Sequence, residues 1–132
     1  MGKLNIISLL VVVVAQVLTG YLWFGPHLFG DVMTGHGVNF LRTDVLSIIL
    51  LLLTAYGLTH VLDTHISNEG VKDVNGGIKL GLTVGSYMIG FPVIMLLNVF
   101  GGFTLNALLA TFGYLVVLTI ITTVVLIKIK KL

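Results

Sequence analysis

The chain lacks cysteine and has few charged residues. Its 132 residues include 0 cysteines, which excludes disulfides, thiolate metal sites and a cysteine nucleophile. Charged residues make up 9% of the chain, whereas a soluble globular protein carries about 25%. The formal net charge is +2, and the basic residues are not grouped with aromatic ones on a polar surface, so nucleic-acid binding has no support. These absences exclude an ordinary soluble domain.

Long apolar runs take up most of the sequence. Hydrophobic residues make up 57% of the chain, and its mean hydropathy is +1.13. Four runs are long enough to cross a bilayer: residues 4–24, 45–62, 78–99 and 103–127. At a rise of 1.5 Å per residue they reach roughly 27 to 37 Å, against a hydrocarbon core of about 30 Å. Since lipid offers the backbone no hydrogen-bond partners, each run is helical. The sequence therefore predicts an all-α integral membrane protein, with residues 1–132 forming one domain of four transmembrane helices.

The distribution of lysine and arginine predicts the orientation of the spans. One side of the membrane would hold Lys3, Lys72, Lys79 and the lysines that follow the fourth run, while the other would hold only Arg42. The positive-inside rule then places the N and C termini and the 63–77 loop in the cytoplasm. The 25–43 loop and the Gly101-Gly102 turn would face the opposite side.

The loop after the first run contains a proline in a position typical of a helix start. Pro26 follows Gly25 and precedes a semi-apolar segment, as at the first position of a helix. We expect a short interfacial helix there, with Tyr21 and Trp23 in the aromatic belt at the membrane surface.

Small residues recur every four positions at the start of the third run. Gly77, Gly81 and Gly85 share one helix face, and Gly90 lies nearby. Small residues at this spacing let another membrane helix approach closely. The face can pack against another span of the same chain or form a subunit interface, and the sequence leaves both open.

Two asparagines flank the turn between the third and fourth runs. Asn98 and Asn106 each lie a few residues from Gly101-Gly102. In an antiparallel hairpin their side chains could bond each other across the turn.

Three tyrosines fall at one depth within the membrane. Counting from the ends of their runs places Tyr56, Tyr87 and Tyr114 roughly 13 to 14 Å from the cytoplasmic boundary. Gln16 of the first run lies a little further out. Since tyrosines normally gather at the membrane surface, the pattern has two interpretations: separate hydroxyl-to-carbonyl bonds in a packed bundle, or a small polar cavity for a ligand or water.

Histidines and aspartates occur together twice. His27, Asp31 and His36 in the 25–43 loop offer a weak candidate for a divalent metal site, although their spacing is equally typical of a solvated loop face. His60, Asp63 and His65 lie at the predicted cytoplasmic end of the second run, where a cationic histidine suits a helix C-terminus and could also sense protons.

No recognisable catalytic motif accompanies these residues. The sequence has no HExxH motif, no Ser-His-Asp set and no phosphate-binding loop placed after a strand. The predicted spans contain no deep Asp, Glu or Arg, and Lys79 is close enough to a span end to snorkel. We therefore expect no enzyme activity and no cofactor.

Several short motifs resemble a known family. The motifs are Trp23-Phe24-Gly25-Pro26, Leu28-Phe29-Gly30, Gly77-x3-Gly81, Gly90-Phe91, Phe100-Gly101 and Gly113-Tyr114. Together they resemble the bacterial "domain of unknown function 1761" proteins. The resemblance implies a small four-helix protein of the bacterial inner membrane, without an assigned activity or functional residues. The family pattern has a leucine where His27 stands, which counts against a family-wide metal site.

Two functions fit these observations. The first is a non-catalytic structural or accessory membrane protein that contacts the lipid bilayer and assembles as a homo-oligomer or within a larger membrane complex. The second is a small channel or transporter with a polar path lined by Gln16, Tyr56, Tyr87 and Tyr114.

Overall fold

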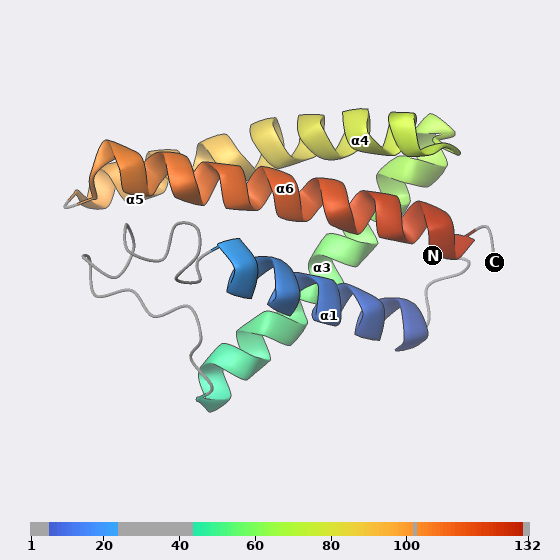
Figure 1. Ribbon diagram of the computed structural model, residues 1–132, viewed down its shortest axis with the longest axis horizontal. Coiled ribbons are helices and arrows are strands. Elements are labelled where there is room, and N and C mark those ends of the chain that lie inside the picture. Colours follow the sequence, from blue (N-terminus) through green and yellow to red (C-terminus); the bar gives the residue numbers. More distant parts are fainter. Residues whose placement is uncertain (1–5, 24–43, 102, 131–132) are drawn as a thin grey trace.

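The described part of the protein is entirely helical. A computed structural model describes residues 6–23, 44–101 and 103–130. The elements in chain order are α1 (Ile6–Trp23), α3 (Val45–Glu69), α4 (Val74–Thr83), the π-helix η1 (Val84–Gly90), α5 (Phe91–Phe100) and α6 (Leu105–Lys130). Since α4, η1 and α5 follow one another directly from Val74 to Phe100, they form one long helix, which we call the third span. Figure 1 shows this helix lying alongside α6.

The four-span prediction is confirmed in its coarse form. Four helices are long and apolar enough to cross a membrane: α1, α3, the third span and α6. The predicted interfacial helix falls in residues 24–43 and lies outside the described residues, as do His27, Asp31 and His36.

The second helix is longer than the apolar run that predicted it. α3 continues past residue 62 to Glu69, and it ends where Gly70 adopts a left-handed conformation with φ of 64°. The Gly70 N–H and the Val71 N–H both donate to the carbonyl of Ile66, which completes the last turn. Glycine enters this conformation without a Cβ clash. The helix end is therefore set by the backbone, and the first polar residues do not interrupt it.

The third span also begins earlier than predicted. Asp73 accepts a hydrogen bond of 2.8 Å from the Gly76 N–H through Oδ1, so the helix starts at Val74, before the apolar run opens at Ile78. A side-chain acceptor at this position satisfies an amide that has no partner within the helix.

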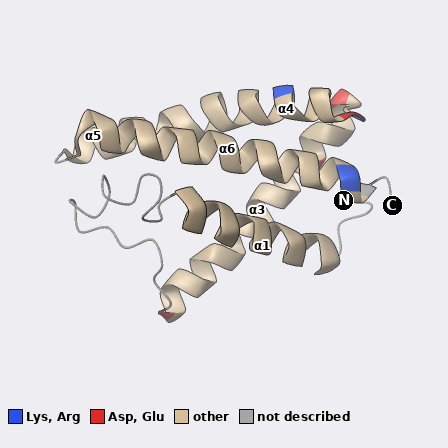
Figure 2. Cartoon of the chain, viewed as in Figure 1, with Lys and Arg blue, Asp and Glu red and all other residues tan. Residues whose placement is uncertain are grey.

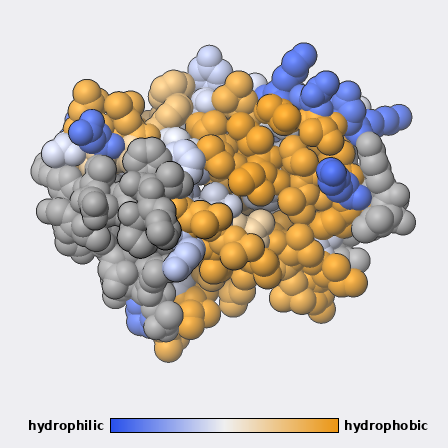
Figure 3. Space-filling view, in the orientation of Figure 1, coloured by the Kyte–Doolittle hydropathy of each residue, from blue (hydrophilic) through white to orange (hydrophobic). Residues whose placement is uncertain are grey.

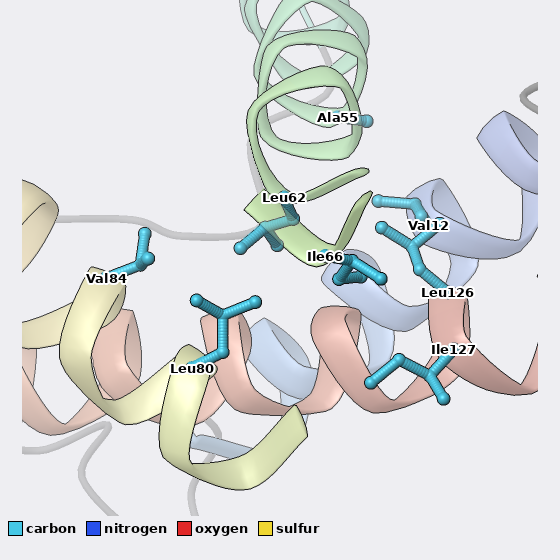
Figure 4. Packing of buried hydrophobic residues seen from close by; sticks show 8 residues of the cluster. All are labelled: Val12, Ala55, Leu62, Ile66, Leu80, Val84, Leu126 and Ile127. Carbon is cyan, nitrogen blue, oxygen red and sulfur yellow. The ribbon is translucent and has the colours of Figure 1, made fainter. Parts of the chain in front are cut away.

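Helix α6 is the centre of the bundle. It packs against α1, α3 and the third span, and Figure 1 shows it running antiparallel to α1. A hydrophobic cluster joins these helices, with Leu62 and Ile66 of α3 converging on side chains from α1, α4 and α6 (Figure 4). Its buried members are Val12, Ala55, Leu62, Ile66, Leu80, Val84, Leu126 and Ile127.

Helix α3 crosses the bundle obliquely, and its first half leaves the other helices (Figure 1). From Val45 to Thr54 every residue is exposed or half-buried. The large exposed apolar side chains there are Val45, Leu46, Ile48, Ile49, Leu50, Leu52 and Leu53. One copy of the chain therefore presents a broad apolar surface on this helix.

Charged residues lie mainly toward the helix ends. Figure 2 shows several of them at the end of the bundle where α4 begins and α6 finishes. Figure 3 shows apolar side chains forming a broad area over the helices between the ends. This distribution suits a protein whose middle is surrounded by lipid.

Candidate functional site: the faces of α6 and the polar groups within the spans

The regularly spaced glycines of the third span lie against α6 of the same chain. A Cβ atom added to Gly81 would lie 2.6 Å from the Cα of Ile120. At Gly77 it would lie 2.5 Å from Cδ1 of Ile127, and at Gly85 it would lie 3.0 Å from the Cα of Val116. The separations at Gly77 and Gly81 are shorter than a real Cβ allows, and the one at Gly85 is tighter than most Cβ contacts. The absence of side chains at these positions therefore lets the two helices approach. Of the two alternatives left by the sequence, the structure shows packing within one chain.

Gly90 also lies at the contact between the third span and α6. A Cβ there would lie 2.7 Å from the carbonyl oxygen of Gly85, one π-helical turn earlier, and 2.7 Å from the Phe112 ring of α6. The residue therefore allows both the wide π turn and the contact with α6.

Trp23 fastens the end of α1 to α6. Its indole Nε1–H donates a hydrogen bond of 2.8 Å to the carbonyl of Ala110. A Cβ added to Gly113 would lie 2.8 Å from Cζ2 of the same indole. The predicted place of Trp23 in an aromatic belt stays a prediction; in the structure its indole lies half-buried against α6. The motif Gly113-Tyr114 was a signal for this contact, because a glycine within an apolar span commonly marks a close approach.

The three tyrosines predicted at one depth differ in their exposure. Tyr56 is 54% exposed and Tyr87 is 70% exposed, whereas Tyr114 and Gln16 are each 7% exposed. Counting residues gave the depth of each tyrosine, but a cavity also requires that all of them face inward. The structure therefore brings only Tyr114 and Gln16 into the interior.

Buried hydroxyls of the interior are mostly satisfied by their own helices. Thr59, Thr119 and Thr123 each donate to the carbonyl four residues earlier, at 2.6 to 2.7 Å. Thr122 is fully buried and Gln16 nearly so, yet Thr122 Oγ1 and Gln16 Oε1 have no hydrogen-bond partner among the described residues. Gln16 of α1 and Thr122 of α6 therefore each place a side-chain oxygen in the interior without a hydrogen bond.

Asp63 corrects the expectation that the spans carry no buried acid. Because α3 continues to Glu69, Asp63 lies within the helix and is only 3% exposed. The histidines beside it lie elsewhere: His60 is exposed and its ring stacks on Tyr56 at a centroid distance of 6.5 Å, and His65 Nδ1 lies 2.9 Å from the carbonyl of Val61. Within the described residues these three side chains do not form a group that could hold a metal ion.

The two asparagines of the predicted hairpin pair, Asn98 and Asn106, are both exposed. The helix ends use other groups: the Gly101 N–H donates to the carbonyls of Leu97 and Asn98, and the hydroxyl of Thr104 accepts from the Ala107 N–H at 3.2 Å. Backbone carbonyls and the Thr104 hydroxyl thus satisfy these amides without the asparagine side chains.

Metal binding has no candidate in the described part of the chain. Within residues 6–23, 44–101 and 103–130 no three histidine or acidic side chains lie together in a way that could hold a metal ion. The weak candidate of His27, Asp31 and His36 lies outside these ranges and stays a prediction.

Comparisons with known proteins add no further assignment. No family model matches the chain, and no curated protein or solved structure matches it. What the described residues show is close packing between helices.

Proposed function

We propose that this chain is a non-catalytic multi-pass membrane protein whose role is to associate with other membrane helices, as a structural or accessory subunit that forms homo-oligomers. The observation that carries the proposal is the exposed first half of α3, where every residue from Val45 to Thr54 is exposed or half-buried. A helix that leaves its own bundle opens space on its flanks that lipid or another helix fills. Membrane helices associate through such packing surfaces.

The internal structure supports the same role. The interior contacts are made by glycine, small polar and aliphatic side chains that hold α6 against its neighbours. Their arrangement is suited to binding helices, because close backbone approach is what drives association when lipid is as apolar as the side chains.

The orientation belongs to the proposal as well. Lys72 precedes the third span and Lys128 lies near the end of α6, and these helix ends lie at the same end of the bundle (Figure 1). By the positive-inside rule this end would lie in the cytoplasm. The bacterial inner membrane is proposed from the family resemblance.

The resemblance to the "domain of unknown function 1761" proteins is likewise proposed. What supports it is that the motif residues meet in space: Trp23 contacts Gly113, and Gly77 and Gly81 lie against α6. Residues that fix helix packing are the ones a related protein would have to keep.

The test is the mass of the particle purified in detergent, measured by light scattering with correction for bound detergent, together with the identity of any copurifying protein. We expect a particle of two or more copies, or one copy bound to another membrane protein. A monomer with nothing bound would contradict the proposal. Ion flux in liposomes that Gln16→Leu abolishes would instead favour the channel or transporter.

A further inference from the structure

The third span is broken at its midpoint by the π-helix and a proline. Tyr87 lies midway between Val74 and Phe100, within η1. The π pattern is visible in the hydrogen bond from the Phe91 N–H to the carbonyl of Ser86, five residues earlier. Pro92 follows immediately. Such π turns inside membrane helices frequently mark functional positions.

The break leaves the carbonyl of Tyr87 without a donor in its own helix. In an α-helix the Phe91 N–H would donate to it, but that N–H donates to Ser86. In a continuing π-helix the donor would come from Pro92, which has no N–H. The carbonyl is therefore free to accept a hydrogen bond from elsewhere.

The same residue presents a hydroxyl group at the surface of the chain. Tyr87 is 70% exposed. Its ring packs on Phe91 at a centroid distance of 5.7 Å, and Phe91 packs on Phe112 of α6 at 5.0 Å. This aromatic row fixes the position of the phenol and reduces the entropy lost when it binds.

A donor and an unsatisfied backbone acceptor at mid-membrane depth are costly in lipid. Irregular backbone at that depth is tolerated where it is buried in protein or lines a water-filled cavity. Tyr56, also exposed, differs because its helix is unbroken and its ring stacks on His60. Tyr21 is exposed too, but it lies in the last turn of α1, away from the middle of its span. Of the described tyrosines near the middle of a span, Tyr87 combines an exposed hydroxyl with a carbonyl that lacks a helical donor.

We propose that the surface around Tyr87 is the contact between two copies of this chain, in which the Tyr87 hydroxyl of each copy donates a hydrogen bond to the Tyr87 carbonyl of the other. Two copies inserted in the same direction place their Tyr87 residues at the same depth. A residue that supplies both donor and acceptor is self-complementary, as a twofold interface requires. This inference rests on the proposed function, for which it names the interface.

The first test compares Tyr87→Phe with Tyr56→Phe. Each variant removes one exposed hydroxyl near the middle of a span, and neither removes a ring. Dimer dissociation is measured in liposomes by energy transfer between labelled copies over a range of protein-to-lipid ratios. Because two interhelical bonds are lost per dimer, Tyr87→Phe should weaken it about tenfold. Tyr56→Phe should leave the dissociation constant unchanged, and equal effects of the two variants would overturn the proposal.

Pro92→Ala provides a second variant that acts on the acceptor. Alanine restores an N–H at this position, which can satisfy a carbonyl of the preceding turn. We expect a weaker dimer with undiminished helix content by circular dichroism. A dimer as strong as the unmodified one would count against the role of the carbonyl.

Single cysteines locate the interface, because the chain has 0 native cysteines. Met88→Cys lies beside Tyr87, whereas Leu53→Cys lies on the exposed half of α3, the other surface through which two copies could associate; both positions are exposed. We expect oxidation to cross-link Met88→Cys efficiently and Leu53→Cys poorly. A dimeric particle that cross-links only through Leu53→Cys would overturn this interface and leave the proposed function intact, whereas a monomer with nothing bound would overturn both.

Discussion

At the scale of single residues, glycine decides where helices meet. Gly81 faces the backbone of Ile120, so the atom that a side chain would strike cannot rotate away. Gly57 in α3 has no atom within 4 Å of an added Cβ. Both positions are glycine, but Gly81 has no room for a side chain and Gly57 has room for one. The difference is that α6 lies against Gly81.

We predict opposite effects for alanine at these two glycines. Gly81→Ala should lower the stability in detergent by about 1 to 3 kcal/mol, because overpacking forces α4 and α6 apart. Gly57→Ala should leave stability unchanged or raise it by up to about 1 kcal/mol, since alanine is the better helix former. Unfolding followed by circular dichroism measures both. Equal effects would mean that Gly81 does not lie against α6.

At the scale of the elements, α6 is contacted by α1 and by the third span through short motifs. The end of α1 is held by the indole of Trp23, and the third span is held by its glycines. Residues separated widely in sequence therefore act on one helix. Of the motifs that resemble a family, those with Trp23, Gly81 and Gly113 contribute contacts between α6 and its neighbours.

Substitution of Gly113 should disturb the docking of α1. Gly113→Val would crowd Cζ2 of the indole, which lies 2.8 Å from a Cβ at this position. The chain has 1 tryptophan, so its fluorescence reports this contact alone. We expect a shifted emission maximum and a loss of roughly 0.5–1.5 kcal/mol of stability as the bond to Ala110 breaks.

A matched control is Leu109→Val, at an exposed position of the same helix. Its emission spectrum should equal that of the unmodified protein. If Gly113→Val also leaves the spectrum unchanged, the indole does not rest on α6 in the membrane.

At the scale of the whole molecule, the ends of the bundle differ in charge. Helix α3 ends at Glu69 and its connection to α4 contains Lys72 and Asp73, while the end of α5 and the start of α6 contain no charged residue among those described. In a membrane this asymmetry governs which end stays in the cytoplasm.

The orientation can be measured with cysteines at exposed positions of opposite ends. Asn98→Cys near the end of α5 should react with a membrane-impermeant maleimide in intact spheroplasts. Asn68→Cys, near the end of α3, should react only after lysis. The reverse pattern of labelling would show that the positive-inside assignment is wrong.

The sequence predicted the four long helices, but it did not predict which face of each helix turns inward. Residue counts placed Tyr56, Tyr87 and Tyr114 at a common level, but the structure turns the first two outward and the third inward. Asp63 was expected at a helix end because a charge follows the apolar run, yet α3 passes through it and buries it. The backbone signals that would have moved the boundary were Gly70 and Asp73.

The sequence by itself determined that the described chain is helical with four helices able to cross a membrane, because the hydrocarbon thickness fixes the length of an apolar run and lipid leaves its backbone no other partners. Only the tertiary structure decided which face of each helix turns inward. Helix geometry fixes the rise per residue and so the length of each span. The rotation of a helix about its own axis depends instead on the helix that packs against it. Gly81 faces α6 and Tyr87 faces outward for that reason.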